Sequence, residues 1–161
     1  MTAPIIMLVL LTAPYVIARL LKSLTARERD LQNAGAVGLT SLFILTGIGH
    51  FTDTDSMAQM LPAWVPGRVR IIYLTGIFEF VIAAGFLFGR TRRLTGWIAA
   101  SMLVIFFPAN IYAAMHHVPQ GGHAWGPVYL LFRAPLQLII LLWIYWFSIK
   151  TPDNPERIDR R

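Results

Sequence analysis

The polar residues inside otherwise apolar stretches are the first candidates for chemistry. Glu79 lies near the middle of residues 71–89, a run long and apolar enough to cross a bilayer. A charged group at membrane depth is costly, so an acid there normally faces other helices or a wet cavity and marks a functional site. Arg133, in another apolar run, is its candidate partner.

Three more polar side chains are predicted at a similar depth. The helical rise of ~1.5 Å per residue gives the depth of each residue below the membrane face. Glu79, Arg133 and Asn110 all lie ~7–12 Å below the same face. His50 closes another run on that side, and Gln137 lies one helical turn from Arg133 on the same face. The predicted ligand-binding residues are His50, Tyr73, Glu79, Asn110, Arg133 and Gln137.

Two interpretations of these residues stay open. In the first, Glu79 and Arg133 form a structural ion pair that locks two helices, and the two amides bridge helices through hydrogen bonds. In the second, the same groups orient a lipophilic ligand with a polar head in a cavity. Glu79 is also the best catalytic candidate, as a proton carrier if the arginine is turned away from it.

The histidines suggest a metal site as a less favoured alternative. His50, His116, His117 and His123 are all predicted on one side of the bundle. Imidazole suits zinc, copper, iron or nickel, but this spacing is not a recognised ligand motif. Solvated or interfacial histidines are therefore the preferred interpretation.

Composition predicts a membrane protein. The 161 residues are 56% hydrophobic and only 14% charged, and the mean hydropathy is +0.58. The net charge of +6 comes from basic residues beside apolar runs rather than from a basic groove, which argues against nucleic-acid binding. Without cysteine the chain can form no disulfide and no thiolate metal site.

The apolar runs predict an all-α transmembrane bundle with one domain, residues 1–150, and a polar tail, residues 151–161. The five predicted spans are residues 3–21, 34–51, 71–89, 94–115 and 127–149. Residues 22–33 are expected at the surface, and residues 52–67 as a re-entrant or surface-lying cap. Pro108 is expected to free a backbone carbonyl, which needs another donor inside the protein.

Charge predicts the orientation. Of the 14 Lys and Arg residues, eleven fall on one side of five alternating spans and two on the other, while Arg133 is within a span. Because the basic side is normally cytoplasmic, the N-terminus is predicted outside and the C-terminus in the cytoplasm.

Five short segments together resemble the DoxX-like family of small bacterial membrane proteins. They are TGIGHF at 46–51, LPAWVPG at 61–67, YLTGIFEF at 73–80, FPANIYAAMH at 107–116 and FRAPLQ at 132–137. The resemblance covers residues 35–149 and implies a four-helix core in a bacterial inner (plasma) membrane, to which the first span is an addition. Some members resemble or accompany subunits of quinone-linked redox complexes.

The leading prediction is a membrane-embedded subunit or binding protein for a lipophilic molecule, with a quinone as the candidate ligand. Its expected partners are membrane lipid, that ligand and a membrane redox subunit, with oligomerisation left open and no nucleic acid. One alternative is a small membrane enzyme of the proton-transfer or isomerase type. The other is an assembly factor in which the Glu79–Arg133 pair is purely structural.

Overall fold

A computed structural model describes residues 2–21 and 28–150, and within them the chain is helical with no strand. The α-helices are α1 (Thr2–Leu21), α2 (Glu28–Thr52), α3 (Thr54–Gln59), α4 (Arg68–Leu87), α5 (Arg92–Met115) and α6 (Leu130–Ile144). A 3-10 segment, η1 (His123–Tyr129), leads into α6, and a π-helical turn, η2 (Tyr145–Ile149), ends it. Five stretches in the described part are long and apolar enough to cross a membrane, as predicted: Pro4–Leu21, Leu31–Thr52, Arg68–Leu87, Arg92–Met115 and His123–Ile149.

The largest differences from the predicted boundaries are at the start of α2, of α4 and of the last span, which begins at His123 rather than at residue 127. α2 already begins at Glu28, so the polar residues 28–33 extend a helix where a surface segment was expected. α4 begins at Arg68, three residues before the predicted start. The residue before it, Gly67, has a left-handed φ of 64°, a conformation that glycine adopts readily. Within residues 52–67 only the six-residue α3 is helical beyond the end of α2, so this segment does not span. Residues 22–27 and the tail 151–161 lie outside the described residues.

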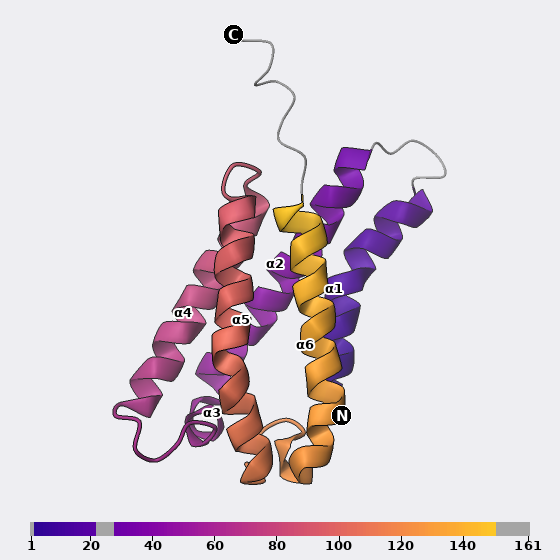
Figure 1. The fold of residues 1–161 in the computed structure, drawn as a ribbon. Coiled ribbons are helices and arrows are strands. Elements are labelled where there is room, and N and C mark those ends of the chain that lie inside the picture. Colours follow the sequence, from indigo (N-terminus) through magenta and orange to yellow (C-terminus); the bar gives the residue numbers. More distant parts are fainter. Residues whose placement is uncertain (1, 22–27, 151–161) are drawn as a thin grey trace.

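The helices alternate in direction, so two ends of the bundle can be distinguished (Figure 1). The start of α1, α3 and the loop 116–122 lie at one end, called here the α3 end. The α4–α5 turn and the end of η2 lie at the other, called here the turn end. The prediction that His50 and the His-rich loop share a side is therefore confirmed.

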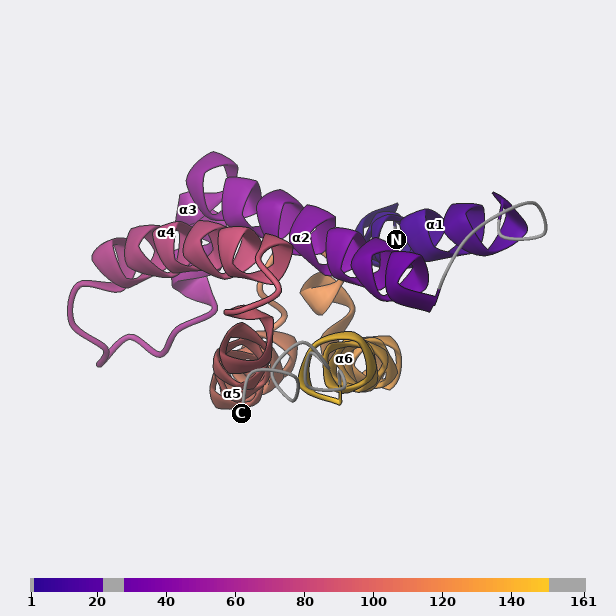
Figure 2. The ribbon, with the colours of Figure 1, turned by 90° about the horizontal axis from the view of Figure 1, so that it is seen from above.

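Seen from above, the helices form two layers (Figure 2). α1, α2 and α4 make one layer, within which α2 packs most extensively against α4 and α1. α5 and α6 make the second layer and cross the first obliquely. Apolar residues from both layers form the core between them: Leu39, Phe43, Ile82, Phe86, Leu136 and Ile140.

Small residues let α2 approach its neighbours closely. A Cβ added to Gly38 would collide with the Leu11 carbonyl oxygen of α1. A Cβ added to Gly76 of α4 would lie 2.7 Å from the His50 Cβ. The Thr40 hydroxyl crosses the same interface and donates to the Ala83 carbonyl at 3.2 Å. Glycines at these positions therefore set the helix spacing that brings His50 alongside α4.

At the turn end, Arg92 folds back onto the helix that precedes it. Its Nε donates to the Phe86 carbonyl at 3.0 Å, and its Nη2 donates to Asn33 Oδ1 at 3.1 Å. Thr91 adds a hydroxyl bond to the Gly85 carbonyl at 2.8 Å. These donors satisfy carbonyls that the end of α4 leaves without helical partners, and they tie α4 and α5 to α2.

Candidate functional site

A cavity of about 460 Å³ lies between the two layers and reaches from the α3 end into the middle of the bundle. All five spans contribute to its walls, which are mainly aliphatic, aromatic and methionine side chains. Five of the six predicted ligand-binding residues line it: His50, Glu79, Asn110, Arg133 and Gln137. The expectation that separate apolar runs bring these groups together is therefore confirmed.

The α2–α4 layer carries the acidic part of the cavity wall. His50 Nε2 lies 3.5 Å from Glu79 Oε1, and His50 Nδ1 lies 3.2 Å from the Thr75 hydroxyl. Glu79 is only 7% exposed, and its Oε2 is enclosed by protein atoms without a hydrogen-bond partner in the described part of the chain. One carboxylate oxygen of Glu79 thus contacts His50 in the same layer, and the other oxygen is not exposed to the cavity.

The α5–α6 layer carries the basic part. Arg133 Nε on α6 donates to Asn110 Oδ1 on α5 at 3.1 Å, and Asn110 in turn donates to the Phe106 carbonyl at 3.2 Å. One turn along α6, Gln137 Nε2 donates to the Leu103 carbonyl at 2.9 Å. That carbonyl is one residue before the Val104 carbonyl, which is the acceptor that the missing Pro108 N–H leaves free.

The guanidinium of Arg133 remains partly open to the cavity. Its Nη1 makes only a weak contact to Met7 Sδ of α1, at 3.9 Å. Its Nη2 has no hydrogen-bond partner among the described residues, yet protein atoms do not enclose it. Since Arg133 lines the cavity, this nitrogen presents free N–H donors there.

The expected ion pair between Glu79 and Arg133 is not formed. Among the described residues Glu79 pairs with His50, and no carboxylate comes within 4.0 Å of Arg133. The two residues do lie at similar depth, but they stand in different layers with the cavity between them. Each charge is therefore held by neighbours in its own layer.

Tyr73 was predicted at the site but lies outside it. Its side chain is 42% exposed and packs against Phe51, with ring centroids 5.5 Å apart. Tyr73 and Glu79 are six residues apart on α4. At about 100° per residue, six residues fall about 120° short of two full turns, so Tyr73 points about 120° away from the direction of Glu79.

The histidines do not form a metal-binding group. Within the described residues no three His, Asp or Glu side chains gather in a way that could hold an ion. His116 stacks on Tyr112 and is exposed, whereas His123 is buried at the mouth of the cavity. The described structure therefore does not gather the histidines of the metal alternative into a set of three ligands.

Sequence reasoning missed three residues that shape the site, Met7, Thr75 and Tyr129, and considered His123 only as a metal ligand. Thr75 could have been found, since it precedes Glu79 by one helical turn. His123 donates from Nδ1 to the Gln120 carbonyl at 2.7 Å and meets the Tyr129 ring edge-on at 4.8 Å. No local pattern in α1 signals that Met7 reaches Arg133.

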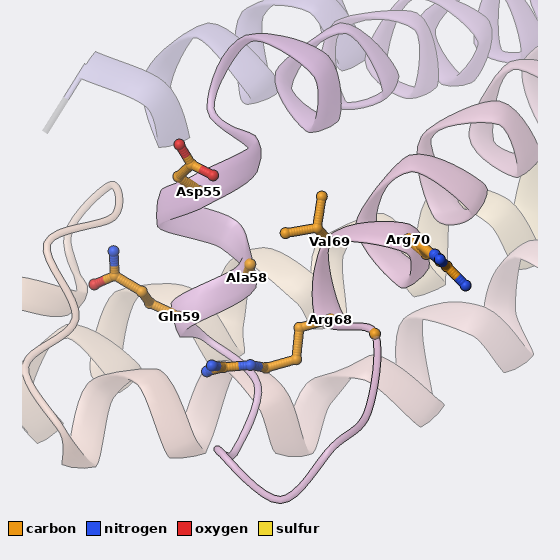
Figure 3. Close-up of a pocket in the computed structure, with 7 residues that line it drawn as sticks. Asp55, Ala58, Gln59, Arg68, Val69 and Arg70 are labelled. Carbon is orange, nitrogen blue, oxygen red and sulfur yellow. The ribbon is translucent and has the colours of Figure 1, made fainter.

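A second hollow lies at the surface between α3 and the start of α4 (Figure 3). Asp55 and Gln59 line it from α3, and Arg68 and Arg70 from α4. Arg68 is held by a hydrogen bond to the Leu61 carbonyl at 3.3 Å, and Arg70 points away from α3. This hollow is open and contains none of the predicted ligand-binding residues.

Comparison with known proteins identifies a family but no activity. No curated protein and no solved structure matches the chain. A family described as a domain of unknown function, DUF8561, matches residues 39–148, which include all the polar residues that line the cavity in the described part of the chain. Because this match covers most of the sequence, the chain belongs to the DUF8561 family.

Proposed function

We propose that this protein is a membrane-embedded binding protein for a lipophilic molecule with a polar head, serving a partner in the same membrane. The observation that carries the proposal is the largely apolar cavity with the Arg133 guanidinium open to it. Cavities of this size are typical of small-molecule sites, in which a few polar groups orient the ligand. Arg133, Asn110 and Gln137 would receive the polar head, and aliphatic side chains would surround the tail.

A quinone is one candidate ligand, and a redox subunit is the corresponding partner. Both follow from the resemblance to the DoxX-like family, which is also why we propose a bacterial inner membrane. In this proposal the α3 end, with the mouth of the cavity, lies at the outer face, because eleven of the 14 Lys and Arg residues belong to the opposite side. A ligand would then enter from the outer leaflet.

The arrangement around Glu79 supports a second candidate function, a proton-transfer or isomerase enzyme. Thr75, His50 and Glu79 follow one another at hydrogen-bonding or ion-pair distances, so a proton given to the carboxylate could be shared with the imidazole. Glu79→Gln would then leave folding and binding intact but remove turnover of the bound molecule.

Native mass spectrometry from mild detergent tests the binding proposal. The purified wild type should carry a bound lipophilic mass that Arg133→Gln loses. Arg90→Gln, in the exposed turn at the other end of the bundle, is the matched control and should keep it. A wild type that carries no such mass, and takes up neither a short-chain quinone nor any other amphiphile, would refute the proposal.

A further inference from the structure

The charge that the cavity offers to a ligand is positive, although both an acid and a base line it. Glu79 presents neither oxygen to the open space, because one lies beside His50 and the other is enclosed by protein. Arg133 has no carboxylate within 4.0 Å among the described residues and keeps Nη2 open, so the charge of Glu79 acts on it only from across the cavity. A guanidinium in apolar surroundings without a counter-charge in direct contact is costly, so an anion is the partner that fits its open edge.

The geometry of the guanidinium narrows the shape of that anion. Asn110 Oδ1 accepts from Nε and thereby fixes the plane of the guanidinium. Asn110 is itself held by its bond to the Phe106 carbonyl, so it acts as a positioning residue. The edge left for a ligand carries Nη1, with its weak thioether contact, and Nη2. Two parallel N–H donors on such an edge match the two oxygens of a carboxylate.

The rest of the cavity suits a flexible hydrocarbon chain. Four methionines line it, Met7, Met57, Met60 and Met102, together with leucine, isoleucine and phenylalanine side chains. Methionine is unbranched and adapts to the irregular surface of a bound chain. No second Lys or Arg lines the cavity in the described part of the protein, so the cavity suits a ligand with one anionic group.

We propose that the ligand is a long-chain carboxylate, with its head on the Nη1–Nη2 edge of Arg133 and its chain among the methionines. This inference rests on the proposed binding function and specifies its ligand class. It differs from a quinone, which offers carbonyl oxygens but no charge. Asn110 determines specificity by holding the guanidinium in the orientation that accepts a planar two-oxygen head.

Competitive titration of the full chain in dodecyl maltoside micelles, with palmitate and methyl palmitate as probes, tests this inference. The two have the same chain and differ in the head group, where a methyl group on one oxygen removes the charge of the ester. Hydrogen bonds to charged groups are strong enough that we expect palmitate to bind about tenfold or more tightly than the ester. Arg133→Gln should abolish this preference, Arg133→Lys should reduce it by losing the two-donor edge, and Arg90→Gln should retain it.

The outcomes separate the inference from the proposed function. Equal binding of acid and ester by the wild type would overturn the carboxylate assignment but leave a lipophilic binding site. If a short-chain quinone binds more tightly than palmitate, the carboxylate assignment is also overturned and the lipophilic binding site again remains. If no amphiphile binds, both proposals fail. The comparison of palmitate with methyl palmitate uses the wild-type protein. The inference can therefore be refuted even if a variant fails to fold.

Discussion

Replacing Glu79 with methionine should make the empty protein more stable. The enclosed Oε2 has no donor, and an unsatisfied buried acceptor costs about 1–3 kcal/mol. The contact that would be lost, 3.5 Å from Oε1 to His50, is longer than the ~2.8 Å of a good charge-assisted bond. Polar side-chain interactions in helical membrane proteins average only about 0.6 kcal/mol. Methionine nearly matches glutamate in length, so Glu79→Met should raise the free energy of unfolding by about 1–2 kcal/mol.

Reversible unfolding of the purified protein from detergent micelles into dodecyl sulfate measures this difference. Asn110→Leu is the matched control, since it removes a buried polar group that is satisfied. It takes away the acceptor of Arg133 Nε and should lower the free energy of unfolding by about 1–3 kcal/mol. If Glu79→Met destabilises the protein as much as Asn110→Leu does, Glu79 is a structural residue and our reasoning about its cost is refuted.

Three further predictions use the same unfolding measurement. Arg92→Met should lower the free energy of unfolding by about 1–3 kcal/mol, because the buried Phe86 carbonyl and the Asn33 side-chain oxygen lose their donor, whereas the exposed Arg90→Met should change it little. Gln137→Leu should lower the free energy of unfolding by about 0.6–1.7 kcal/mol, because the Leu103 carbonyl on α5 loses its bond to Gln137. An unchanged free energy of unfolding would mean that this hydrogen bond does not stabilise the bundle. Gly38→Leu should cost about 1–3 kcal/mol by pushing α1 away, while Gly89→Leu, in open surroundings, should be tolerated.

The spans and the depth of the polar residues could be predicted because both depend on local properties of the sequence. An apolar run of sufficient length determines each span, and the position of Glu79 or Arg133 within its run determines its depth. The same logic underlies the interpretation in which Gln137 bridges helices, since a buried amide must find a partner, and Gln137 does bond across to α5.

The pairing of charges could not be predicted, because it depends on which helices share a layer. Depth alone allowed Glu79 to meet Arg133, but α4 packs beside α2 and α6 beside α5, so each residue found a nearer partner. Tyr73 is a different kind of error. Its rotation of about 120° from Glu79 follows from helical geometry, so the sequence alone is enough to place Tyr73 away from the other polar residues.

The cavity is built from two parts of the chain, α1 and the residues that match the family. The match to the DUF8561 family begins at residue 39, so it includes Glu79, Asn110 and Arg133 but not α1. α1 nevertheless closes one wall of the cavity with Met7, and its contact to Arg133 is weak. The residues that we propose to bind a polar head therefore belong to the family domain. We expect substitutions in the first turns of α1 to change the preferred chain length of a ligand, while leaving the preference for its head group unchanged.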